Sequence, residues 1–218
     1  LKTLKSFRCL IREEKPDKIF AYQAKSVIYG GLAAAAVCDM LGFSGDEIGE
    51  TLSSFVGLIR RFEYKGTING ADVYIDYAHT PDGMKNLLSS LKNSCSGRLV
   101  CVFGCGGNRD KEKRKIMGQI SAKNSDFTVI TSDNPRFEDP MEIINEKQTP
   151  KRNFKRRQRR IAIENREEAI KYAINILKVG DVLLIAGKGS EKYQEILGIK
   201  KPYCDKDTIV EYLRGEYL

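Results

Sequence analysis

The strongest constraint on the fold is a repeated alternation that begins at Tyr64. Short apolar runs rich in branched residues alternate there with segments of helical spacing. This alternation is typical of βα units around a mostly parallel sheet, because each run has the length of a buried strand and each amphipathic segment can cover its face. We therefore expect an α/β fold with a doubly wound, mostly parallel sheet. The predicted strands are Ala71–Ile75, Arg98–Phe103, Phe127–Thr131, a weaker Ile161–Ile163 and Asp181–Ala186, and the predicted helices are Pro81–Leu91, Lys113–Lys123, Pro140–Glu146, Glu167–Lys178 and Asp207–Leu213.

The chain before that point has helical spacing and no strand-like run. Alanine-rich Ser26–Leu41 predicts a packed helix that ends at Gly42, where a left-handed residue can terminate it. A second helix is expected over Gly45–Phe55, because two acidic residues lie in its first turn. Residues 1–62 thus form a small helical piece, which is too small to fold well alone and is expected to pack on something else. The α/β domain is expected over residues 63–218.

Membrane insertion and secretion are not expected. None of the apolar runs approaches the roughly 20 residues needed to cross a bilayer, and Leu1–Phe20 carries charges throughout, unlike a signal peptide. We therefore expect a cytoplasmic protein, in the simplest case a monomer. The six cysteines have no C-x-x-C spacing and one histidine to accompany them, so neither a metal site nor a disulfide framework is expected.

The positive charge of the chain is concentrated in Lys151–Arg160. This segment holds seven basic residues and no acidic one, so only +1 of the net +8 belongs to the rest of the chain. Such a run can bind phosphates by releasing counterions. A solvated loop or an insertion between ordered elements is commoner, and we favour it. A non-catalytic module that binds a polyanion such as nucleic acid stays as the alternative function.

Chemically active side chains follow four of the predicted strands, at the edge where an open parallel sheet binds ligands. Neither common nucleotide motif is present among them. Arg109 stands where G-x-G-x-x-G requires its third glycine, and no G-x-x-x-x-G-K-[ST] occurs in the chain. The four segments are Asp76–Asp82, Gly104–Asp110, Ser132–Arg136 and Gly187–Glu191.

These strand ends suit a zwitterionic amino acid. Two arginines can pair its carboxylates, two carboxylates can accept from its ammonium, an asparagine can serve either group, and a glycine allows close backbone approach. For a single arginine the ordinary alternative is a surface ion pair worth little. His79, the only histidine, is left open between capping the next helix, a polar core and a ligand contact. The proposed residues are Arg109 and Arg136, Asp133 and Glu191, Asn134, and Gly187.

Four motifs in order, DYAHTPD, FGCGGNRDKEKR, TSDNPRFEDP and IAGKG-x-E-x-Y-Q, resemble the Mur ligase family. Within it the resemblance is strongest to members that add meso-diaminopimelate to UDP-N-acetylmuramoyl-L-alanyl-D-glutamate. It runs from about Val27 to the end and is densest from Tyr74 to Tyr193. It implies a Rossmann-like C-terminal, amino-acid-binding domain over residues 63–218, preceded over residues 1–62 by a helical remnant of a central ATP-binding domain.

The resemblance also implies the roles of particular residues. The arginine of the DNPR tetrad is associated with diaminopimelate rather than lysine, because the former has a second carboxylate to pair. A lysine-adding or polyglutamate-adding ligase is the alternative within the family, and Arg136 argues against the first. No catalytic residue and no metal ligand is expected within the chain. The implied diaminopimelate pocket is Arg109, Asp133, Asn134, Pro135, Arg136, Gly187 and Glu191, and the nucleotide side is Arg61, Asp76 and His79.

The implied reaction is an ADP-forming amide ligation. ATP phosphorylates the glutamyl carboxylate, and the incoming amine attacks the acyl phosphate, with Mg²⁺ and a lysine offsetting phosphate charge. The phosphate loop, the metal ligands, the modified lysine and the nucleotide-sugar domain of the family are missing from this sequence. We therefore expect an isolated chain without turnover and without a tightly bound cofactor, whose ligands are an amino acid and a nucleotide-sugar peptide, with no membrane or nucleic-acid partner.

Three departures weaken the half of the ATP site that remains. Ala24–Gly30 lacks the asparagine of the usual G-x-F-N-x-x-N, and Ile59–Glu63 keeps Arg61 but loses the flexible Pro-Gly before it. Ser190 replaces the histidine of the usual G-K-G-H-E. The loss of the Pro-Gly hinge is the departure that bears on closure of the domains.

Overall fold

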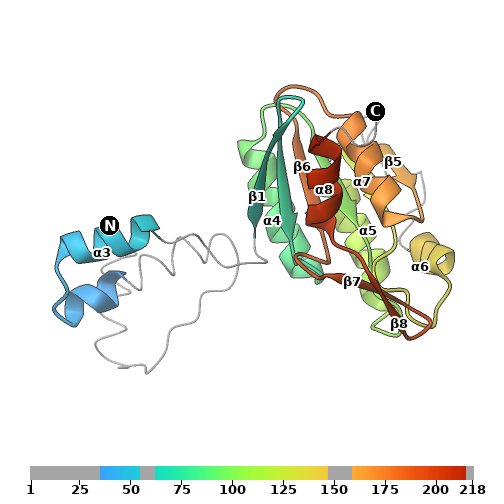
Figure 1. The fold of residues 1–218 in the computed structure, drawn as a ribbon, viewed down its shortest axis with the longest axis horizontal. Helices are drawn as coiled ribbons and strands as arrows, with labels where there is room; N and C mark the ends of the chain where they lie inside the picture. The colour runs from blue at the N-terminus through green and yellow to red at the C-terminus, as the bar shows by residue number, and fades with distance from the viewer. Residues whose placement is uncertain (1–34, 55–61, 147–158, 215–218) are drawn as a thin grey trace. The chain divides into compact units, whose positions relative to one another are not determined.

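A computed structural model describes residues 35–54, 62–146 and 159–214. The chain divides into two compact units, Leu1–Gly57 and Leu58–Leu218 (Figure 1). Among the described residues, no helix is long and apolar enough to span a membrane.

The first unit contains two helical segments joined by a tight turn. Residues 35–40 are helical, and Gly42 follows in a left-handed conformation with φ +92°, as the sequence predicts. Helix α3 (Gly45–Ser54) begins with a capping box, in which the Ser44 hydroxyl accepts from the Glu47 N–H and the Glu47 carboxylate accepts from the Ser44 N–H. The start of the predicted alanine-rich helix and Phe55 lie outside the described residues.

The second unit is built on a six-stranded sheet in the order β1-β2-β6-β3-β4-β5. Strands β2, β6, β3, β4 and β5 are parallel, and β1 pairs antiparallel with β2 at one edge. The doubly wound α/β architecture is therefore confirmed. The strands are β1 (Glu63–Ile68), β2 (Ala71–Asp76), β3 (Leu99–Phe103), β4 (Phe127–Ile130), β5 (Arg159–Ala162) and β6 (Val182–Ala186).

Helices cover both faces of this sheet (Figure 1). Helices α4 (Pro81–Ser94), α5 (Glu112–Asn124) and α6 (Pro140–Glu146) contribute to one core cluster with Leu99, Cys101 and Phe103 of β3. Helices α7 (Arg166–Asn175) and α8 (Asp205–Leu213) contribute to the other with Val100 and Val102. All five residues of β3 are buried because successive side chains point to opposite, covered faces.

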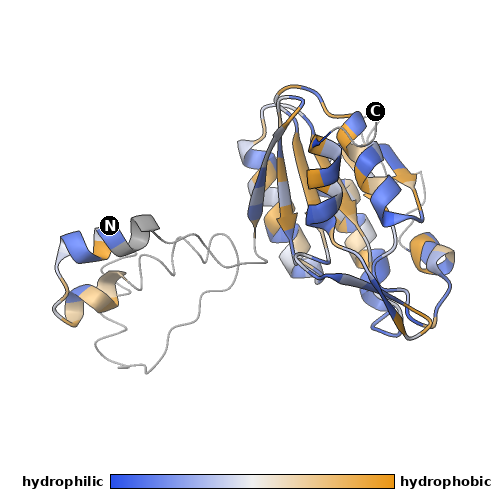
Figure 2. Cartoon of the chain, in the orientation of Figure 1, coloured by the Kyte–Doolittle hydropathy of each residue, from blue (hydrophilic) through white to orange (hydrophobic). Residues whose placement is uncertain are grey.

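Two hairpins were not predicted, because β1, β7 and β8 have no apolar run. Strand β1 reaches β2 through Asn69–Gly70, both with positive φ, a strong hairpin signal between weak strands. Strands β7 (Tyr193–Ile196) and β8 (Ile199–Pro202) form a separate two-stranded sheet through Leu197–Gly198. Figure 2 shows mostly hydrophilic colours along β1 and β7 and hydrophobic colours along β6.

The basic segment is not a loop throughout, contrary to expectation. Arg159 and Arg160 belong to β5, where they pair with Phe127 and Thr128 of β4. The strand therefore begins two residues before the predicted Ile161, because its paired position beside β4 outweighs the weak strand propensity of charged residues. Residues 151–158 of the segment lie outside the described residues.

Candidate functional site

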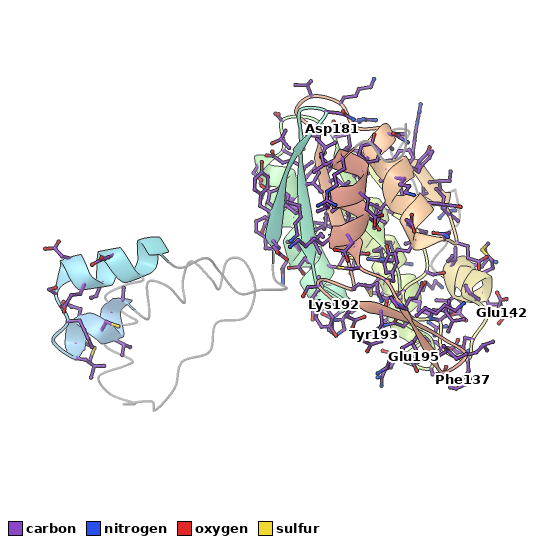
Figure 3. All side chains as sticks on the ribbon, viewed as in Figure 1. Phe137, Glu142, Asp181, Lys192, Tyr193 and Glu195 are labelled. Carbon is purple, nitrogen blue, oxygen red and sulfur yellow. The ribbon has the colours of Figure 1, made fainter. Side chains whose placement is uncertain are left out.

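The four polar segments predicted to follow the strands meet at one edge of the sheet. The Gly187 N–H donates to the Asp76 carbonyl over 3.1 Å, and the Gly107 N–H donates to the Asn134 carbonyl over 2.8 Å. A Cβ on Gly104 would lie 2.8 Å from the Asp133 nitrogen, so the second and third segments pack backbone against backbone. In Figure 3, Tyr193 and Glu195 lie at this edge and Asp181 lies at the opposite end of β6.

Asn134 lies at the centre of the polar cluster and is 4% exposed. Its Oδ1 accepts from Lys188 Nζ at 2.9 Å and from the Glu195 N–H at 3.0 Å. Its Nδ2 donates to Glu191 Oε2 at 3.0 Å. The side chain therefore joins the ends of β4 and β6 to strand β7.

Lys188 belongs to this cluster, although sequence reasoning did not select it. Its side chain is completely buried, and its Nζ lies 3.1 Å from Glu191 Oε2 and 3.6 Å from Asp133 Oδ1. The ammonium is also 5.9 Å from the centre of the Tyr193 ring. A lysine between two glycines, directly after a buried apolar run, was the available signal, and it was set aside because the motif is not a Walker loop.

Asp133 and Glu191 supply the predicted negative charge. Asp133 is buried, and its backbone carbonyl accepts from Gln194 Nε2 at 2.7 Å. Gly187 is left-handed with φ +108°, and a Cβ there would lie 2.9 Å from Asp133 Oδ2. The glycine thus allows the backbone after β6 to approach this carboxylate closely, as its predicted role requires.

Arg136 is positioned by the second hairpin. Its backbone has φ 53°, its N–H donates to the Glu195 carbonyl at 3.0 Å, and its carbonyl accepts from the Leu197 N–H at 2.7 Å. Its Nη1 donates to the Gly107 carbonyl at 2.8 Å, and its Nε lies 3.2 Å from Glu195 Oε2. Its Nη2 makes no hydrogen bond with a described residue, so part of the guanidinium fork is available to a carboxylate.

Arg109 reaches the same surface from the loop after β3. The residue is exposed and makes no hydrogen bond or ion pair with the part of the chain that the structure describes. A Cβ on Gly106 would lie 3.9 Å from Arg109 Cγ and 2.8 Å from Arg136 Nη1. Gly106 therefore separates the stem of one arginine from the guanidinium of the other. Pro135 is buried beside them, with its carbonyl oxygen against Gly107.

Tyr77 is a further residue of the cluster that the sequence did not indicate. Burial raises the pKa of its hydroxyl, and the negative charges of Glu191 and Asp133 raise that pKa further. The ring packs edge-on against His79 with 4.7 Å between ring centres.

The residues predicted for the nucleotide side are only partly described. Arg61 lies outside the described residues. Asp76 is buried, and its two carboxylate oxygens accept from the Ala78 and Phe62 N–H groups at 2.6 Å each. His79 is exposed, and its Nδ1 lies 2.9 Å from the Tyr77 carbonyl. It neither lies in a core nor caps helix α4, whose cap is the Thr80 hydroxyl.

A buried ion pair supports the site from the α7 and α8 side of the sheet. Arg166 and Asp205 are both fully buried and are joined by bonds of 2.7 and 2.8 Å. Arg166 also donates to the carbonyls of Ser132 and Ala186, the residues that follow β4 and end β6. Attraction to Asp205 raises the pKa of Arg166 although burial opposes it. The pair thereby fixes the two strand ends that carry Asn134 and Lys188.

A second network holds the loop after β3. Arg114 is buried, and its guanidinium donates to both oxygens of Glu138, to Glu146 at 2.7 Å and to the Gly106 carbonyl at 3.3 Å. The hydrogen bonds from Arg114 lower the pKa of Glu138 to about 2. Glu138 also accepts from the Asn108 N–H. This network fixes the backbone at Gly106 and Asn108, directly before Arg109.

The described residues hold no group of three or more histidine, cysteine, aspartate or glutamate side chains arranged for a metal ion. The side chains of Glu191 and Arg136 are 21% and 19% exposed, so both reach the surface of the cluster. A hollow of about 460 Å³ reaches Ser190, next in the chain to Glu191. Its lining includes Glu63, Lys192, Tyr203 and Lys206.

Comparison with known proteins gives consistent relatives. The family model described as Mur ligase, glutamate ligase domain, matches residues 60–189. The UDP-N-acetylmuramoyl-L-alanyl-D-glutamate--2,6-diaminopimelate ligase of Syntrophomonas wolfei is 43% identical over 189 residues, which cover 87% of this chain and 38% of that protein. The enzyme of that name from Caldanaerobacter subterraneus is 41% identical over 210 residues, or 95% of this chain and 42% of the relative.

Solved structures agree with these relatives. A structure of a UDP-N-acetylmuramoyl-L-alanyl-D-glutamate--2,6-diaminopimelate ligase matches with a TM-score of 0.69 and 30% identity, covering 92% of this chain and 40% of that one. Thermotoga maritima UDP-N-acetylmuramate-alanine ligase shares the fold, with a TM-score of 0.56 and 23% identity over 79% of this chain and 36% of its own. The chain thus spans about two fifths of the length of the curated relatives named above.

Proposed function

Because this chain belongs to the Mur ligase family, we propose that it is the amino-acid-binding part of an ADP-forming ligase that adds meso-diaminopimelate to UDP-N-acetylmuramoyl-L-alanyl-D-glutamate. The observation that carries the proposal is the meeting of Asp133, Asn134 and Glu191 with two arginines at one sheet edge. Carboxylates there can accept from the ammonium of an amino acid, and the arginines can pair its carboxylates.

Diaminopimelate suits this arrangement better than a monocarboxylic diamine. Arg136 keeps one end of its guanidinium available, and Arg109 has no partner among the described residues. Two arginine forks match a ligand with two carboxylates, whereas lysine would leave one fork without an anion. We accordingly assign Arg109, Asp133, Asn134, Pro135, Arg136, Gly187 and Glu191 to the pocket.

Nucleotide binding by this chain is proposed only in part. The family uses ATP, yet the 218 residues contain no G-x-x-x-x-G-K-[ST] loop, so they do not fit the triphosphate or its Mg²⁺. We propose that Arg61, Asp76 and His79 face the nucleotide side and that the phosphates are held by residues outside this sequence. Residues 1–62 are then a remnant of the central ATP-binding domain, and residues 63–218 are the C-terminal domain.

The role of this chain in the reaction is positioning. A held ammonium group and paired carboxylates place the reactive amine of the incoming amino acid, and such placement lowers the entropic part of the barrier. The acceptor of that amine, the activated glutamyl group of the nucleotide-sugar peptide, is not bound by any residue assigned here. We therefore propose ligand binding without turnover for the chain alone, in a cytoplasmic monomer.

Calorimetric titration of the chain with meso-diaminopimelate tests the proposal, with L-lysine as the control ligand. We expect weak, saturable binding of diaminopimelate, because part of the site is open to solvent, and weaker binding of L-lysine, because it lacks the second carboxylate. A folded protein that shows no heat of binding at millimolar diaminopimelate contradicts the pocket assignment. Equal affinity for both ligands contradicts the role of the second arginine.

A further inference from the structure

Lys188 has the properties of a residue that organises the pocket without touching its ligand. The side chain has no exposed surface, although a lysine ammonium is normally solvated. Its Nζ contacts Asn134 Oδ1, Glu191 Oε2 and Asp133 Oδ1 at 2.9, 3.1 and 3.6 Å. Two of its three N–H donors are used in hydrogen bonds to Asn134 and Glu191, and Asp133 lies at ion-pair distance.

The first consequence concerns the orientation of the Asn134 amide. Its Oδ1 has two acceptor positions, and Lys188 Nζ and the Glu195 N–H occupy both. The amide is thereby turned so that its Nδ2 faces Glu191, with a second N–H on the same nitrogen. Asn134 can then offer only a donor to a ligand, so it recognises a carboxylate rather than an ammonium.

The second consequence concerns charge. Asp133 and Glu191 together carry two negative charges, and Lys188 lies within 4 Å of both. The three groups therefore leave one net negative charge, which matches one ligand ammonium. Without Lys188 the two carboxylates would present a doubly negative site, which favours a dication over a zwitterion.

We propose that Lys188 is a positioning residue that turns the Asn134 amide donor-outward and sets the charge of the Asp133–Glu191 pair to match a single ammonium. The inference rests on the proposed function, because it assigns a specificity role within that same pocket. It predicts that loss of the lysine changes which ligand is preferred, whereas a merely structural lysine would weaken all ligands in proportion.

The test compares two ligands by calorimetry on the full 218-residue chain. The ligands are meso-diaminopimelate and 1,5-diaminopentane, which has the same pair of amines without carboxylates. For the unmodified chain we expect diaminopimelate to bind at least about tenfold better, an effect of roughly 1.4 kcal/mol. In Lys188→Met we expect the affinity for diaminopimelate to fall about tenfold or more, and the affinity for the diamine to stay the same or rise.

Three further variants separate the effect of the Lys188 charge from the effect of its hydrogen bond to Asn134. Lys188→Arg keeps the charge and should keep the preference for diaminopimelate. Lys188→Gln keeps a donor for Asn134 but loses the charge, so it should raise the relative affinity for the diamine. Lys178→Met makes the same change at an exposed lysine before β6, at the opposite end of the strand, and should leave both affinities unchanged.

Each of these measurements either supports or overturns the proposed role of Lys188. A proportional loss for both ligands in Lys188→Met and Lys188→Gln, or no change in the preference, overturns the role of Lys188 and leaves the proposed function standing. Absence of diaminopimelate binding by the unmodified chain overturns the proposed function, and the inference with it.

If the Lys188 variants fail to fold, a measurement on the unmodified chain still tests the proposal. Saturation with diaminopimelate should shift the NMR signals of the two Asn134 side-chain amide protons. If saturating ligand leaves these signals in place, the inference is wrong.

Discussion

The Asn134 amide nitrogen donates to the Glu191 carboxylate over 3.0 Å, although the two residues are 57 positions apart in the chain. One residue follows β4 and the other follows β6, so the bond exists only because the parallel sheet brings both strand ends to one edge. It links the DNPR and GKG motifs into a single polar cluster.

Replacement of Arg136 by lysine should change ligand preference. Arg136→Lys keeps the positive charge but removes the planar fork that can pair a carboxylate through two bonds. We expect diaminopimelate to bind about tenfold more weakly, in line with the roughly 1.5 kcal/mol of a charged hydrogen bond, and L-lysine to change little. Parallel titrations with the two ligands measure this, and an equal loss for both would count against a carboxylate role.

Replacement of Gly187 by alanine should destabilise the second unit and weaken binding. The glycine has φ +108°, and a Cβ would lie 2.9 Å from Asp133 Oδ2, so alanine is strained in its backbone and against the carboxylate. The expected loss is about 1–3 kcal/mol in the free energy of unfolding, measured in urea. Gly49→Ala, in helix α3 where a Cβ meets nothing within 4 Å, is the control and should not destabilise. Equal stability of Gly187→Ala and the parent chain would contradict the close approach.

Loss of the buried Arg166–Asp205 ion pair should lower stability more than loss of an exposed ion pair. Asp205→Asn leaves the Arg166 guanidinium buried without its counter-charge, which should cost about 3–5 kcal/mol of unfolding free energy. Lys92→Met, which removes an ion pair whose lysine is 43% exposed, should cost only about 0–1 kcal/mol. Urea unfolding of the two variants gives the comparison, and similar losses would show that Arg166 does not depend on Asp205.

Lowering the pH should weaken the Arg114–Glu138 network that holds the loop after β3, over a range set by the pKa of Glu138. Arg114 lowers the pKa of Glu138 from 4.5 to about 2, so the folded state favours the ionised carboxylate. The stabilisation is present above the unfolded pKa and is lost as the pH falls from about 4.5 to about 2. Glu138→Gln should flatten the fall in unfolding free energy over this range. An unchanged pH profile in that variant would show that another carboxylate is responsible.

The sheet and its helices could be predicted because their signals are local. Each buried strand is a continuous apolar run, as in the fully buried β3 and β6, and most boundaries differ from the prediction by one to three residues. The hairpins were missed because β1 and β7–β8 have exposed or half-exposed residues with no such run. Asn69–Gly70 was a readable turn signal, but the flanking strands were too polar to support it.

The site was predictable in composition but not in its internal bonds. The strand-end rule selected Asp133, Asn134 and Glu191, and the structure brings them together. Lys188 was missed because its importance comes from its complete burial, which is visible only in three dimensions. Asn134 was left open between two ligand groups, since the occupants of its amide oxygen are visible only in three dimensions.

The most direct test of the whole account is an NMR titration of the isotopically labelled chain with meso-diaminopimelate. We expect saturable shifts confined to the backbone and side chains of residues 104–109, 132–136 and 187–195, with Asn134 and Arg136 among the largest. Shifts scattered over the surface, or no shifts at millimolar ligand in a folded chain, would contradict it.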